Sequence, residues 1–481
     1  MPTVLDLLER ATKDAPDNPV VVVPGRVVTY RELETLSKRL GAVLSKESKT
    51  PVVAMFFPMS PEFIAAYFGV LYAGKQALPL NLLLPPDELK WILNDSGADL
   101  IVAPPELAPK LAPLGVRVLD YAQLCKQTDS APPSSLAHPA PEDICTLLYT
   151  SGTTGKPKGV MLTHRNLASN AVNAVAAIRL LPEHRFLACL PSFHTFAITG
   201  TTLAPIAVGA SLATLPRFDP EAVLKTASDL KCDTLMMVPS MYRLVTRMQE
   251  RRPHDMKHLR IAISGGEALP ADVRERFAQV FGIPLLEGYG QTESGPVVSF
   301  NLPWANQAGT VGKPIDSVEI RTIDPETLQA AAPGEIWIKS PGVMKGYHNR
   351  PEETAKALTA DGWLRTGDMG ELTPDGYIRI TGRLREMIKV AGEMVFPAEV
   401  ESALCQHPSV IEAGVVGVKD ERKGESVKAY VVLKPGEQAT EEQLIQHCRG
   451  VLAAYKVPKA IEFRSELPKG PTGKVMRRLL K

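Results

Sequence analysis

One segment of this sequence combines the residue types that hold a polyphosphate. Residues 149 to 160 read YTSGTTGKPKGV and follow the apolar run ICTLL. An apolar run that ends in a polar loop is typical of a strand end. Glycines let backbone N–H groups turn toward an anion, hydroxyls add donors, and Lys156 and Lys158 add positive charge. We therefore interpret the segment as a loop that binds the phosphates of a nucleotide.

A P-loop is the first alternative, and the spacing argues against it. A P-loop has four residues between its first glycine and the Gly-Lys pair, and then a Ser or Thr that binds Mg²⁺. Here two residues separate Gly152 from Gly155, and Pro157 follows Lys156. Proline has neither a hydroxyl nor an N–H to offer. The loop alone is also compatible with a solvated turn. Other segments must therefore distinguish a phosphate-binding loop from such a turn.

Two of those segments offer groups for a base and a metal ion. ISGGEALP, at 263–270, places two glycines between an expected strand and an expected helix. They allow either a close approach to a flat ring such as adenine or an ordinary tight turn. In EGYGQTESG, at 287–295, Tyr289 could stack on a base, and Glu293, next to Thr292, could hold Mg²⁺ at phosphate oxygens.

Three later segments offer groups for a ribose and for anions. GWLRTGDMG places Asp368 in a glycine-flanked turn, where it could accept both ribose hydroxyls or cap the turn itself. TGRLREMIKVAGEM supplies Arg383 and Lys389, and LPKGPTGKVMRR places Lys474 on a glycine-flanked loop. A frayed basic tail is the alternative interpretation of the last segment.

The bulk properties limit the class of protein. With 481 residues the chain is long enough for two or more domains. The net charge of +1 creates no field that would favour nucleic acid or an anionic membrane. The six cysteines form no CxxC pair, which argues against zinc and a disulfide framework and favours a reducing compartment.

The elements that must position these residues alternate between short apolar runs and helical patterns. This alternation predicts an α/β fold in which helices cover parallel sheets on both faces. Strands are expected at 51–57, 99–103, 233–239 and 260–264, and a helix at 61–74. The first 14 residues have an amphipathic helical pattern rather than that of a signal peptide. Because prolines and Glu62 interrupt the most apolar region, we expect no membrane span and a cytoplasmic protein, with peripheral membrane contact left open.

The pattern changes toward the C-terminus. A Pro/Ser-rich surface linker is expected at 128–143 and β-rich structure at 315–382. A smaller α+β unit follows, with helices at 397–407 and 439–453 and strands at 412–418 and 428–434. Thr440 and Gln443 are spaced as a capping box. We place the domain boundary near Arg385, which gives domains at 1–384 and 385–481.

Taken together, the motifs resemble those of the adenylate-forming superfamily. The family includes acyl-CoA synthetases, aryl-CoA ligases, beetle luciferases and peptide-synthetase adenylation domains. YTSGTTGKPKG, LPSFHTF, SGGEAL, EGYGQTE, GWLRTGD, GRLREMIKVAGEM and PTGK occur in the expected order over nearly the whole chain. The resemblance implies a large N-terminal domain of helix-covered, mostly parallel sheets with a small β-barrel-like subdomain, and a small mobile α+β C-terminal domain.

The resemblance also implies the chemistry. ATP and a carboxylic acid form an acyl adenylate with release of pyrophosphate, and coenzyme A then takes the acyl group and AMP leaves. Since the carboxylate and the triphosphate repel each other, cations and oriented donors must stabilise the transition state. Lys474 would bridge the α-phosphate and the carboxylate, Thr292 would touch the α-phosphate, and Glu293 would hold Mg²⁺. The remaining nucleotide residues implied are Thr150, Ser151, Gly152, Thr153, Thr154, Gly155, Lys156 and Lys158 for pyrophosphate, Gly265, Gly266, Glu267 and Tyr289 for adenine, Asp368 and Arg383 for the ribose, and Gly288, Gly290 and Ile380 as further ATP- or AMP-binding residues.

The second step implies a rotation of the small domain about a hinge. The hinge falls on Arg385, where the family often has Asp or Lys. Val390, Ala391 and Gly392 would then line a tunnel for coenzyme A, and Lys389 matches a residue that assists in aryl-CoA ligases. Met394 stands where those relatives often have Gln, so that polar contact is missing here.

LPSFHTF bears on the acid. Amino-acid-activating relatives have an Asp in this region, whereas this chain has His194, which the family places at the mouth of the acyl pocket. Apolar neighbours (TLMMVPSMY, GPVVSF) favour a fatty acid first and an aryl acid such as a cinnamate second. The absence of an obvious insertion before the hinge favours coenzyme A over a carrier protein.

Three other functions remain to be distinguished: an acyl-AMP ligase that loads a carrier protein, a luciferase and an inactive nucleotide-binding regulator. No expected charge is missing, so the sequence gives the last no support. We expect a monomer or homodimer that acts on small molecules and binds no nucleic acid.

Overall fold

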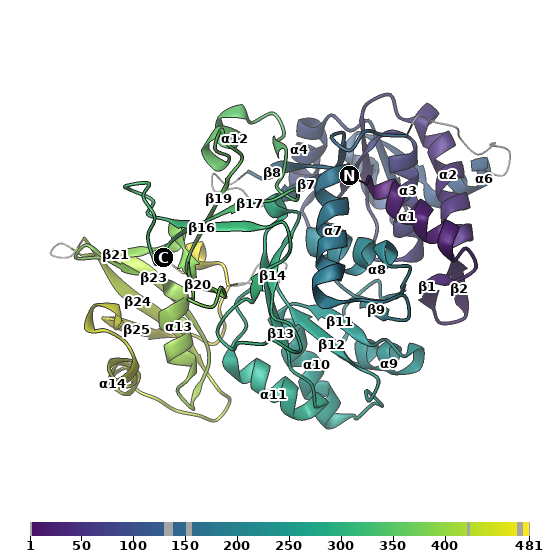
Figure 1. Cartoon of the computed structure of the whole chain (residues 1–481). Helices are drawn as coiled ribbons and strands as arrows, with labels where there is room; N and C mark the ends of the chain where they lie inside the picture. Colours follow the sequence, from purple (N-terminus) through teal and green to yellow (C-terminus); the bar gives the residue numbers. More distant parts are fainter. Residues whose placement is uncertain (1, 129–137, 151–155, 421–423, 469–474, 481) are drawn as a thin grey trace. The chain divides into compact units, whose positions relative to one another are not determined.

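The computed structural model describes residues 2–128, 138–150, 156–420, 424–468 and 475–480 (Figure 1). The chain divides into two compact units. The first contains Met1–Glu319 and Ile338–Leu364, and the second contains Ile320–Trp337 and Arg365–Lys481. The expected boundary at Arg385 thus lies within the second unit, and a hinge at this residue stays a prediction.

A nine-stranded sheet forms one half of the first unit. Its order is β15-β14-β13-β12-β11-β9-β10-β1-β2. The strands from β13 to β1 pair in parallel, whereas β14, β15 and β2 are antiparallel to their neighbours. In sheet order the strands are Lys313–Pro314, Val297–Phe300, Leu286–Gly290, Ile261–Ser264, Thr234–Met237, Arg185–Ala188, Ser211–Thr214, Pro19–Val23 and Arg26–Thr29.

A seven-stranded sheet forms the other half of this unit. Its order is β18-β8-β7-β4-β3-β5-β6, with β7, β4, β3, β5 and β6 parallel and with β8 and β18 antiparallel to their neighbours. In sheet order the strands are Gly346–Tyr347, Lys158–Thr163, Ile144–Thr150, Gln76–Pro79, Val52–Met55, Leu100–Ala103 and Arg117–Asp120. The mostly parallel architecture predicted from the sequence is confirmed.

Helices connect and cover these strands, because each parallel connection must return across the sheet. The apolar segment at 61–74 forms α3, in which every residue from Phe63 to Tyr72 is buried. Helices α9, α10 and α11 lie side by side next to β11 and β12 (Figure 1). The helices of the unit are α1 (Val4–Asp14), α2 (Tyr30–Glu47), α3 (Pro61–Tyr72), α4 (Pro86–Ser96), α5 (Ala108–Leu111), α6 (Tyr121–Thr128), α7 (His164–Ile178), α8 (Ala204–Ala207), α9 (Pro220–Leu230), α10 (Pro239–Arg251), α11 (Ala271–Phe281) and α12 (Pro351–Ala357), with 3-10 turns at Ala112–Leu114 and Thr292–Ser294 and a π-helix at Phe196–Leu203.

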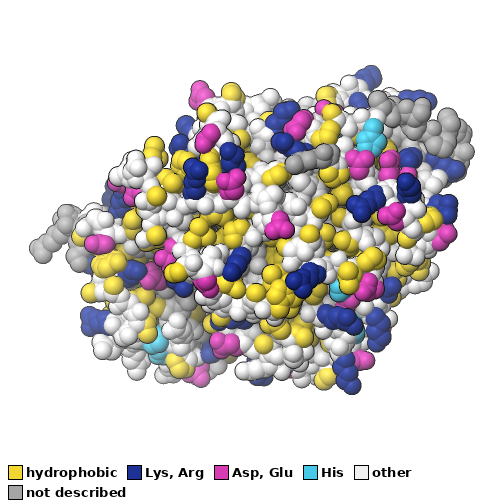
Figure 2. Space-filling model, in the orientation of Figure 1, with side chains coloured by type: hydrophobic (Ala, Val, Ile, Leu, Met, Phe, Trp, Pro, Cys, Tyr) yellow, Lys and Arg dark blue, Asp and Glu magenta, His cyan; other side chains and the backbone are white. Residues whose placement is uncertain are grey.

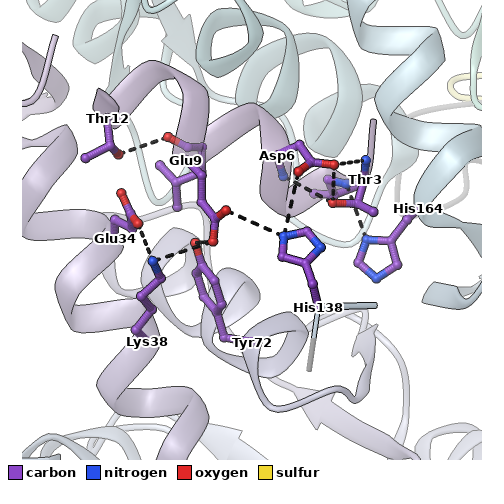
Figure 3. A network of polar contacts seen from close by, with 11 residues as sticks. Thr3, Asp6, Glu9, Thr12, Glu34, Lys38, Tyr72, His138 and His164 are labelled. Carbon is purple, nitrogen blue, oxygen red and sulfur yellow. Dashed lines mark hydrogen bonds and ion pairs between the residues drawn. The ribbon is translucent and has the colours of Figure 1, made fainter. Parts of the chain in front are cut away.

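The N-terminal helix is held to its neighbours by a polar network (Figure 3). Thr3 and Asp6 form a capping box at the start of α1. The Glu9 carboxylate accepts a hydrogen bond from the Tyr72 hydroxyl of α3 (3.1 Å) and lies 3.5 Å from Lys38 of α2. The amphipathic helix predicted at the N-terminus is therefore part of the folded core. Most of the predicted linker at 128–143 lies outside the described residues.

The second unit contains two smaller sheets. The four-stranded sheet β16-β17-β19-β20 occupies the region predicted to be β-rich, and the five-stranded sheet consists of β22-β21-β24-β23 with β25 paired to β24. The predicted strands at 412–418 and 428–434 lie within β23 and β24, and the predicted helices are α13 and α14, with the expected capping box at Thr440 and Gln443. The elements are β16 (Glu319–Ile323), β17 (Gly334–Lys339), β19 (Leu364–Leu372), β20 (Ile378–Arg383), η4 (Leu384–Glu386), β21 (Ile388–Val390), β22 (Glu393–Val395), α13 (Pro397–Cys405), β23 (Val410–Asp420), β24 (Gly424–Leu433), α14 (Glu441–Val451), η5 (Ala454–Lys456), β25 (Ala460–Phe463) and η6 (Arg477–Leu479).

Figure 2 shows basic and acidic side chains interspersed on the visible face, as a net charge of +1 allows. Among the described residues, no helix is both long enough and apolar enough to cross a membrane.

Candidate active site

The predicted phosphate loop joins two antiparallel strands. Thr150, the last residue of β7, pairs with Lys158, the first residue of β8. Ser151, Gly152, Thr153, Thr154 and Gly155 lie outside the described residues. The Tyr149 hydroxyl donates to the Asp95 carboxylate of α4 (2.8 Å), so the end of β7 is held in place just before the loop.

The two lysines that follow the loop are each held by neighbouring side chains. Lys156 lies 5.9 Å from the centre of the Trp91 ring, and Lys158 lies 5.2 Å from the centre of the Tyr347 ring. Lys158 also forms an ion pair with Glu353 of α12, and its side chain is only 16% exposed. The positive charge at the start of β8 therefore has a defined position.

Four predicted or neighbouring residues meet at the turn Thr292–Ser294. The Tyr347 hydroxyl donates to the Glu293 carboxylate at 2.9 Å, and the Thr292 and Thr195 hydroxyls are 2.8 Å apart. Burial and the adjacent Glu293 charge raise the pKa of Tyr347, so its hydroxyl remains a donor at neutral pH. The motifs LPSFHTF and EGYGQTE are thus connected directly, although they are about 100 residues apart in the sequence.

The glycines predicted to bind the nucleotide differ in why the structure needs a glycine at each position. A Cβ at Gly265 would lie 3.4 Å from the Phe196 ring, and Gly266 has a φ of +84°. By contrast, a Cβ at Gly290 would lie 1.7 Å from the Pro296 carbonyl oxygen. Gly290 is therefore required by the chain itself, whether or not a ligand is present. Glu267 and Tyr289 are both half-buried.

Two side chains beside these glycines have shifted pKa values. Glu287 is buried, and burial raises its pKa to about 7, while its carboxylate accepts a hydrogen bond from the Leu269 backbone (2.9 Å). The Nδ1 of His194 accepts a hydrogen bond from the Phe196 backbone (3.2 Å), and desolvation by the surrounding chain lowers the pKa of the ring. A neutral imidazole with an acceptor at Nδ1 carries its proton on Nε2, which leaves that nitrogen as a donor.

The predicted ribose residues lie in the second unit. The glycine-flanked turn predicted at Asp368 is wrong, because Asp368 lies within β19 and pairs with Arg383 of β20. The strand accommodates Gly367 at a φ of +68° and shifts its register after Met369, so the glycines mark a strand irregularity. The Asp368 carboxylate is 2.9 Å from the Arg383 guanidinium and is almost fully buried. Ile380 lies two strand pairs further along the same ladder.

The predicted coenzyme A segment is a hairpin between β21 and β22. Ala391 and Gly392 form its two-residue turn, with φ values of +53° and +92°. Two positive φ values are characteristic of a type I′ turn, which explains the glycine. Lys389 forms an exposed ion pair with Glu326 (2.9 Å), Val390 is buried, and Arg385 is exposed within η4.

The described residues predicted to bind phosphate and adenine thus lie in the first unit, and those predicted to bind the ribose and to line the tunnel lie in the second unit. Lys474 lies outside the described residues. The sequence analysis missed Tyr347, Glu353, Asp95 and Thr195, which contact predicted site residues across long sequence separations. The polar, proline-containing segment GYHNRPEE at 346–353 is the one feature that could have drawn attention to two of them.

The donor set fits a metal–nucleotide complex. Carboxylate and phosphate oxygens are the ligands that Mg²⁺ prefers, and Glu293 lies on the same cluster as Lys158, a cation suited to phosphate. On the base side, Gly265 keeps the backbone free of a side chain beside the Phe196 ring. The residues therefore offer both charge and space to a bound nucleotide.

Comparisons with known proteins give matches over nearly the whole chain. A family model described as AMP-binding enzyme matches residues 8–348, and one described as AMP-binding enzyme C-terminal domain matches 399–474. A long-chain-fatty-acid–CoA ligase of Bacillus subtilis is 35% identical over 526 residues, which cover 99% of this chain and 94% of the relative. A feruloyl-CoA synthase of Amycolatopsis is 36% identical over 476 residues, covering 97% and 96%. The crystal structure of ATP-bound MatB from Rhodopseudomonas palustris superimposes with a TM-score of 0.92 at 30% identity and covers 100% of this chain and 98% of that one.

Proposed function

Because this chain belongs to the AMP-binding enzyme family, we propose that it activates a carboxylic acid with ATP and transfers the acyl group to coenzyme A. It is an AMP-forming acyl-CoA synthetase that binds ATP and AMP. The first step joins the acid oxygen to the α-phosphorus and releases pyrophosphate, and the second joins the thiol sulfur to the acyl carbon and releases AMP.

The observation that carries this proposal is the cluster at the turn Thr292–Ser294. Thr195, Thr292, Glu293, Tyr347 and Lys158 form one set of donors, a carboxylate and a cation next to the predicted phosphate loop. Two anions must meet in adenylation, and fixed positive and donor groups lower the energy of that encounter without reorganisation. A Mg²⁺ ion held by Glu293 would neutralise phosphate charge during the same step.

The acid is proposed to be a fatty acid. A long-chain-fatty-acid–CoA ligase is among the similar proteins, and the segment after His194 supports an apolar substrate. The π-helix Phe196–Leu203 is almost entirely buried, and Gly200 packs so closely that a Cβ would lie 3.2 Å from the Met236 sulfur. His194 can donate from Nε2 to a carboxylate while remaining neutral.

An aryl acid is the second candidate. The similarity to a feruloyl-CoA synthase, at 36% identity and over nearly the full length of both chains, favours it specifically. Ferulate and fatty acids share an apolar body with one carboxylate, so both fit an apolar pocket with a single polar end.

Assignments in the second unit belong to the proposal as well. Asp368 and Arg383 would bind the ribose, Lys389 and the turn Val390–Gly392 would serve the thiol step, and Lys474 would serve adenylation. A rotation of residues 385–481 about Arg385 between the two steps is part of this scheme. The six cysteines form no CxxC pair, which supports a reducing, cytoplasmic location, and this location stays a prediction.

A panel of acids tests the proposal. Pyrophosphate release is measured with ATP, Mg²⁺ and acetate, octanoate, palmitate, benzoate or p-coumarate, and acyl-CoA formation is followed by mass spectrometry. We expect release that depends on palmitate or octanoate and a thioester with free coenzyme A. Pyrophosphate release in the absence of any acid would contradict the proposed function. Failure of all the acids in the panel to cause release would also contradict it.

A further inference from the structure

The Tyr347 side chain contacts Lys158 and Glu293, which are proposed to bind the ATP phosphates and the metal ion. Its hydroxyl donates to the Glu293 carboxylate at 2.9 Å, and its ring lies 5.2 Å from the Lys158 ammonium group. We propose that Tyr347 is a positioning residue that orients Glu293 toward the metal ion and fixes Lys158 beside it. This inference rests on the proposed function.

The backbone around Tyr347 is fixed from two sides, so the position of the hydroxyl is determined before any ligand binds. On one side, Tyr347 pairs with Val160 of β8, and the His348 N–H donates to the Gly159 carbonyl (2.7 Å). On the other side, the Met344 N–H donates to the Glu293 carbonyl (2.9 Å). The segment therefore connects β8, which carries Lys158, to the turn that carries Glu293.

Two glycines allow a close contact between the segment that leads to Tyr347 and the turn Thr292–Ser294. A Cβ at Gly342 would lie 2.6 Å from the Ser294 carbonyl oxygen, and one at Gly295 would lie 2.7 Å from the Gly342 carbonyl oxygen. Such a close approach keeps the distance between the Glu293 backbone and Tyr347 short. The Tyr347 N–H donates in turn to the Thr354 hydroxyl of α12 (2.9 Å), the helix whose Glu353 pairs with Lys158.

The chemical reason for such a residue is the requirement of a metal ligand for orientation. A carboxylate that receives a hydrogen bond on one oxygen has fewer rotamers, and it presents its other oxygen in one direction. Removing an outer partner of this kind typically costs about 10- to 100-fold in metal affinity. The Tyr347 ring also covers one side of the Lys158 ammonium group and restricts its orientation. Less conformational freedom is therefore lost when this ammonium group binds a phosphate.

The test compares Tyr347→Phe with a matched control. Phenylalanine keeps the ring beside Lys158 and removes only the hydroxyl that donates to Glu293. Tyr72→Phe removes a similar tyrosine–glutamate hydrogen bond, from Tyr72 to Glu9 (3.1 Å), between α3 and α1. Binding of α,β-methylene-ATP is measured by calorimetry for the full chain with Mg²⁺ and with a chelator, and thermal unfolding is recorded for each variant.

We expect Tyr347→Phe to weaken binding of the Mg²⁺ complex by about 10-fold and to change metal-free binding by less than about twofold. Tyr72→Phe should change neither constant. In a Glu293→Gln background, the Tyr347→Phe substitution should add no further loss, because the residue that it orients is no longer a charged ligand.

Two results would overturn the inference while the proposed function stands. One is that Tyr347→Phe and Tyr72→Phe give the same two constants, and the other is that Tyr347→Phe weakens metal-free and Mg²⁺-bound forms equally, as a purely structural residue would. If the wild-type protein binds the analogue no better with Mg²⁺ than without it, the metal role of Glu293 fails, and the inference fails with it. The acid-dependent release of pyrophosphate then decides separately about the proposed function.

Discussion

Two lysine–glutamate pairs, one in each unit, show how differently the chain treats the cations of its candidate site. Lys158 pairs with Glu353, and the two side chains are 16% and 27% exposed. Lys389 pairs with Glu326 at 2.9 Å, and these side chains are 56% and 77% exposed. The first lysine also faces the Tyr347 ring, whereas the second lies on the edge of a short hairpin.

The difference indicates which cation is positioned in advance. A charge held in a partly desolvated place interacts strongly with an incoming anion, and its partner is needed when that anion is absent. An exposed pair is screened by water and salt and contributes little. We therefore expect Lys158 to stabilise charge in the reaction and Lys389 to remain mobile enough to change partners.

The largest expected effect is that of Lys158→Ala. Removing this cation should lower kcat/KM for acid-dependent pyrophosphate release by about 100-fold, because a fixed positive charge near the phosphates is lost. Steady-state kinetics with varied ATP would measure it. The exposed Lys225, which pairs with Asp229 along α9, gives the matched control Lys225→Ala, for which we expect no change. Equal rates for the two variants would remove Lys158 from the site.

The next largest effect is the pH dependence of stability that the burial of His164 causes. His164, at the start of α7, is 2% exposed, and its Nδ1 accepts a hydrogen bond from the Val4 backbone (3.3 Å; Figure 3). Desolvation lowers its pKa from 6.5 to about 4. Since the unfolded chain binds the proton more readily, stability is complete above pH 6.5 and is lost as the pH falls toward 4. This group should contribute a loss of about 2 kcal/mol between pH 6.5 and about pH 5.

Denaturant unfolding of the wild type and of His164→Asn at several pH values would measure this loss. Asparagine keeps an acceptor near the position of Nδ1 but does not titrate. The variant should therefore show a shallower fall in unfolding free energy over the same range. If both proteins lose stability in parallel, the buried histidine has no part in the pH dependence.

Asp368 tests whether the effect of a substitution depends on the burial of the charged pair or on the unit in which the pair lies. It lies in the second unit, as Lys389 does, but its carboxylate is 3% exposed and pairs with Arg383 at 2.9 Å. We expect Asp368→Asn to raise the KM for ATP by about 10-fold with a smaller change in kcat, because the ribose loses an acceptor. An unchanged KM with a lowered melting temperature would make the pair structural only.

The smallest effect is expected for Glu326→Gln. The bond to Glu326 raises the pKa of Lys389 above 10.5, so its contribution to stability is present below that pH and is lost only as the pH rises through the raised value. Because both side chains are exposed, that contribution is small. Between pH 6 and pH 9 the variant should therefore unfold nearly like the wild type, and thioester formation should change by less than about twofold. A larger change in the thioester step would show that this exposed pair holds Lys389 in a working position.

Local patterns in the sequence predicted much of the fold. The apolar runs at 51–57, 99–103, 233–239 and 260–264 are strands of the two large sheets, since alternating apolar runs and helices determine this layering. The capping box at Thr440 is confirmed because its two partners are three residues apart. The turn predicted around Asp368 is wrong, because glycine also serves at strand irregularities; a Cβ at Gly370 would lie 2.4 Å from the Arg379 carbonyl oxygen.

Local sequence patterns could not predict the long-range hydrogen bonds between side chains of the candidate site. Tyr347 and Glu293 are 54 residues apart, and Thr195 and Thr292 are 97 residues apart. Hydrophobic periodicity describes which face of an element is buried and does not specify which polar groups meet where strands end. Motifs supplied the residues of the site, and the sheet order determined which of them became neighbours.

The most direct test of the account follows the oxygen atoms of the acid. The enzyme is given ATP, coenzyme A and palmitate in which both carboxylate oxygens carry a heavy isotope, and the products are analysed by mass spectrometry. We predict that AMP acquires a single heavy oxygen and that palmitoyl-CoA keeps the other, because the acid oxygen attacks the α-phosphorus and leaves with AMP. Unlabelled AMP, or label in orthophosphate together with ADP, would contradict acyl adenylate formation.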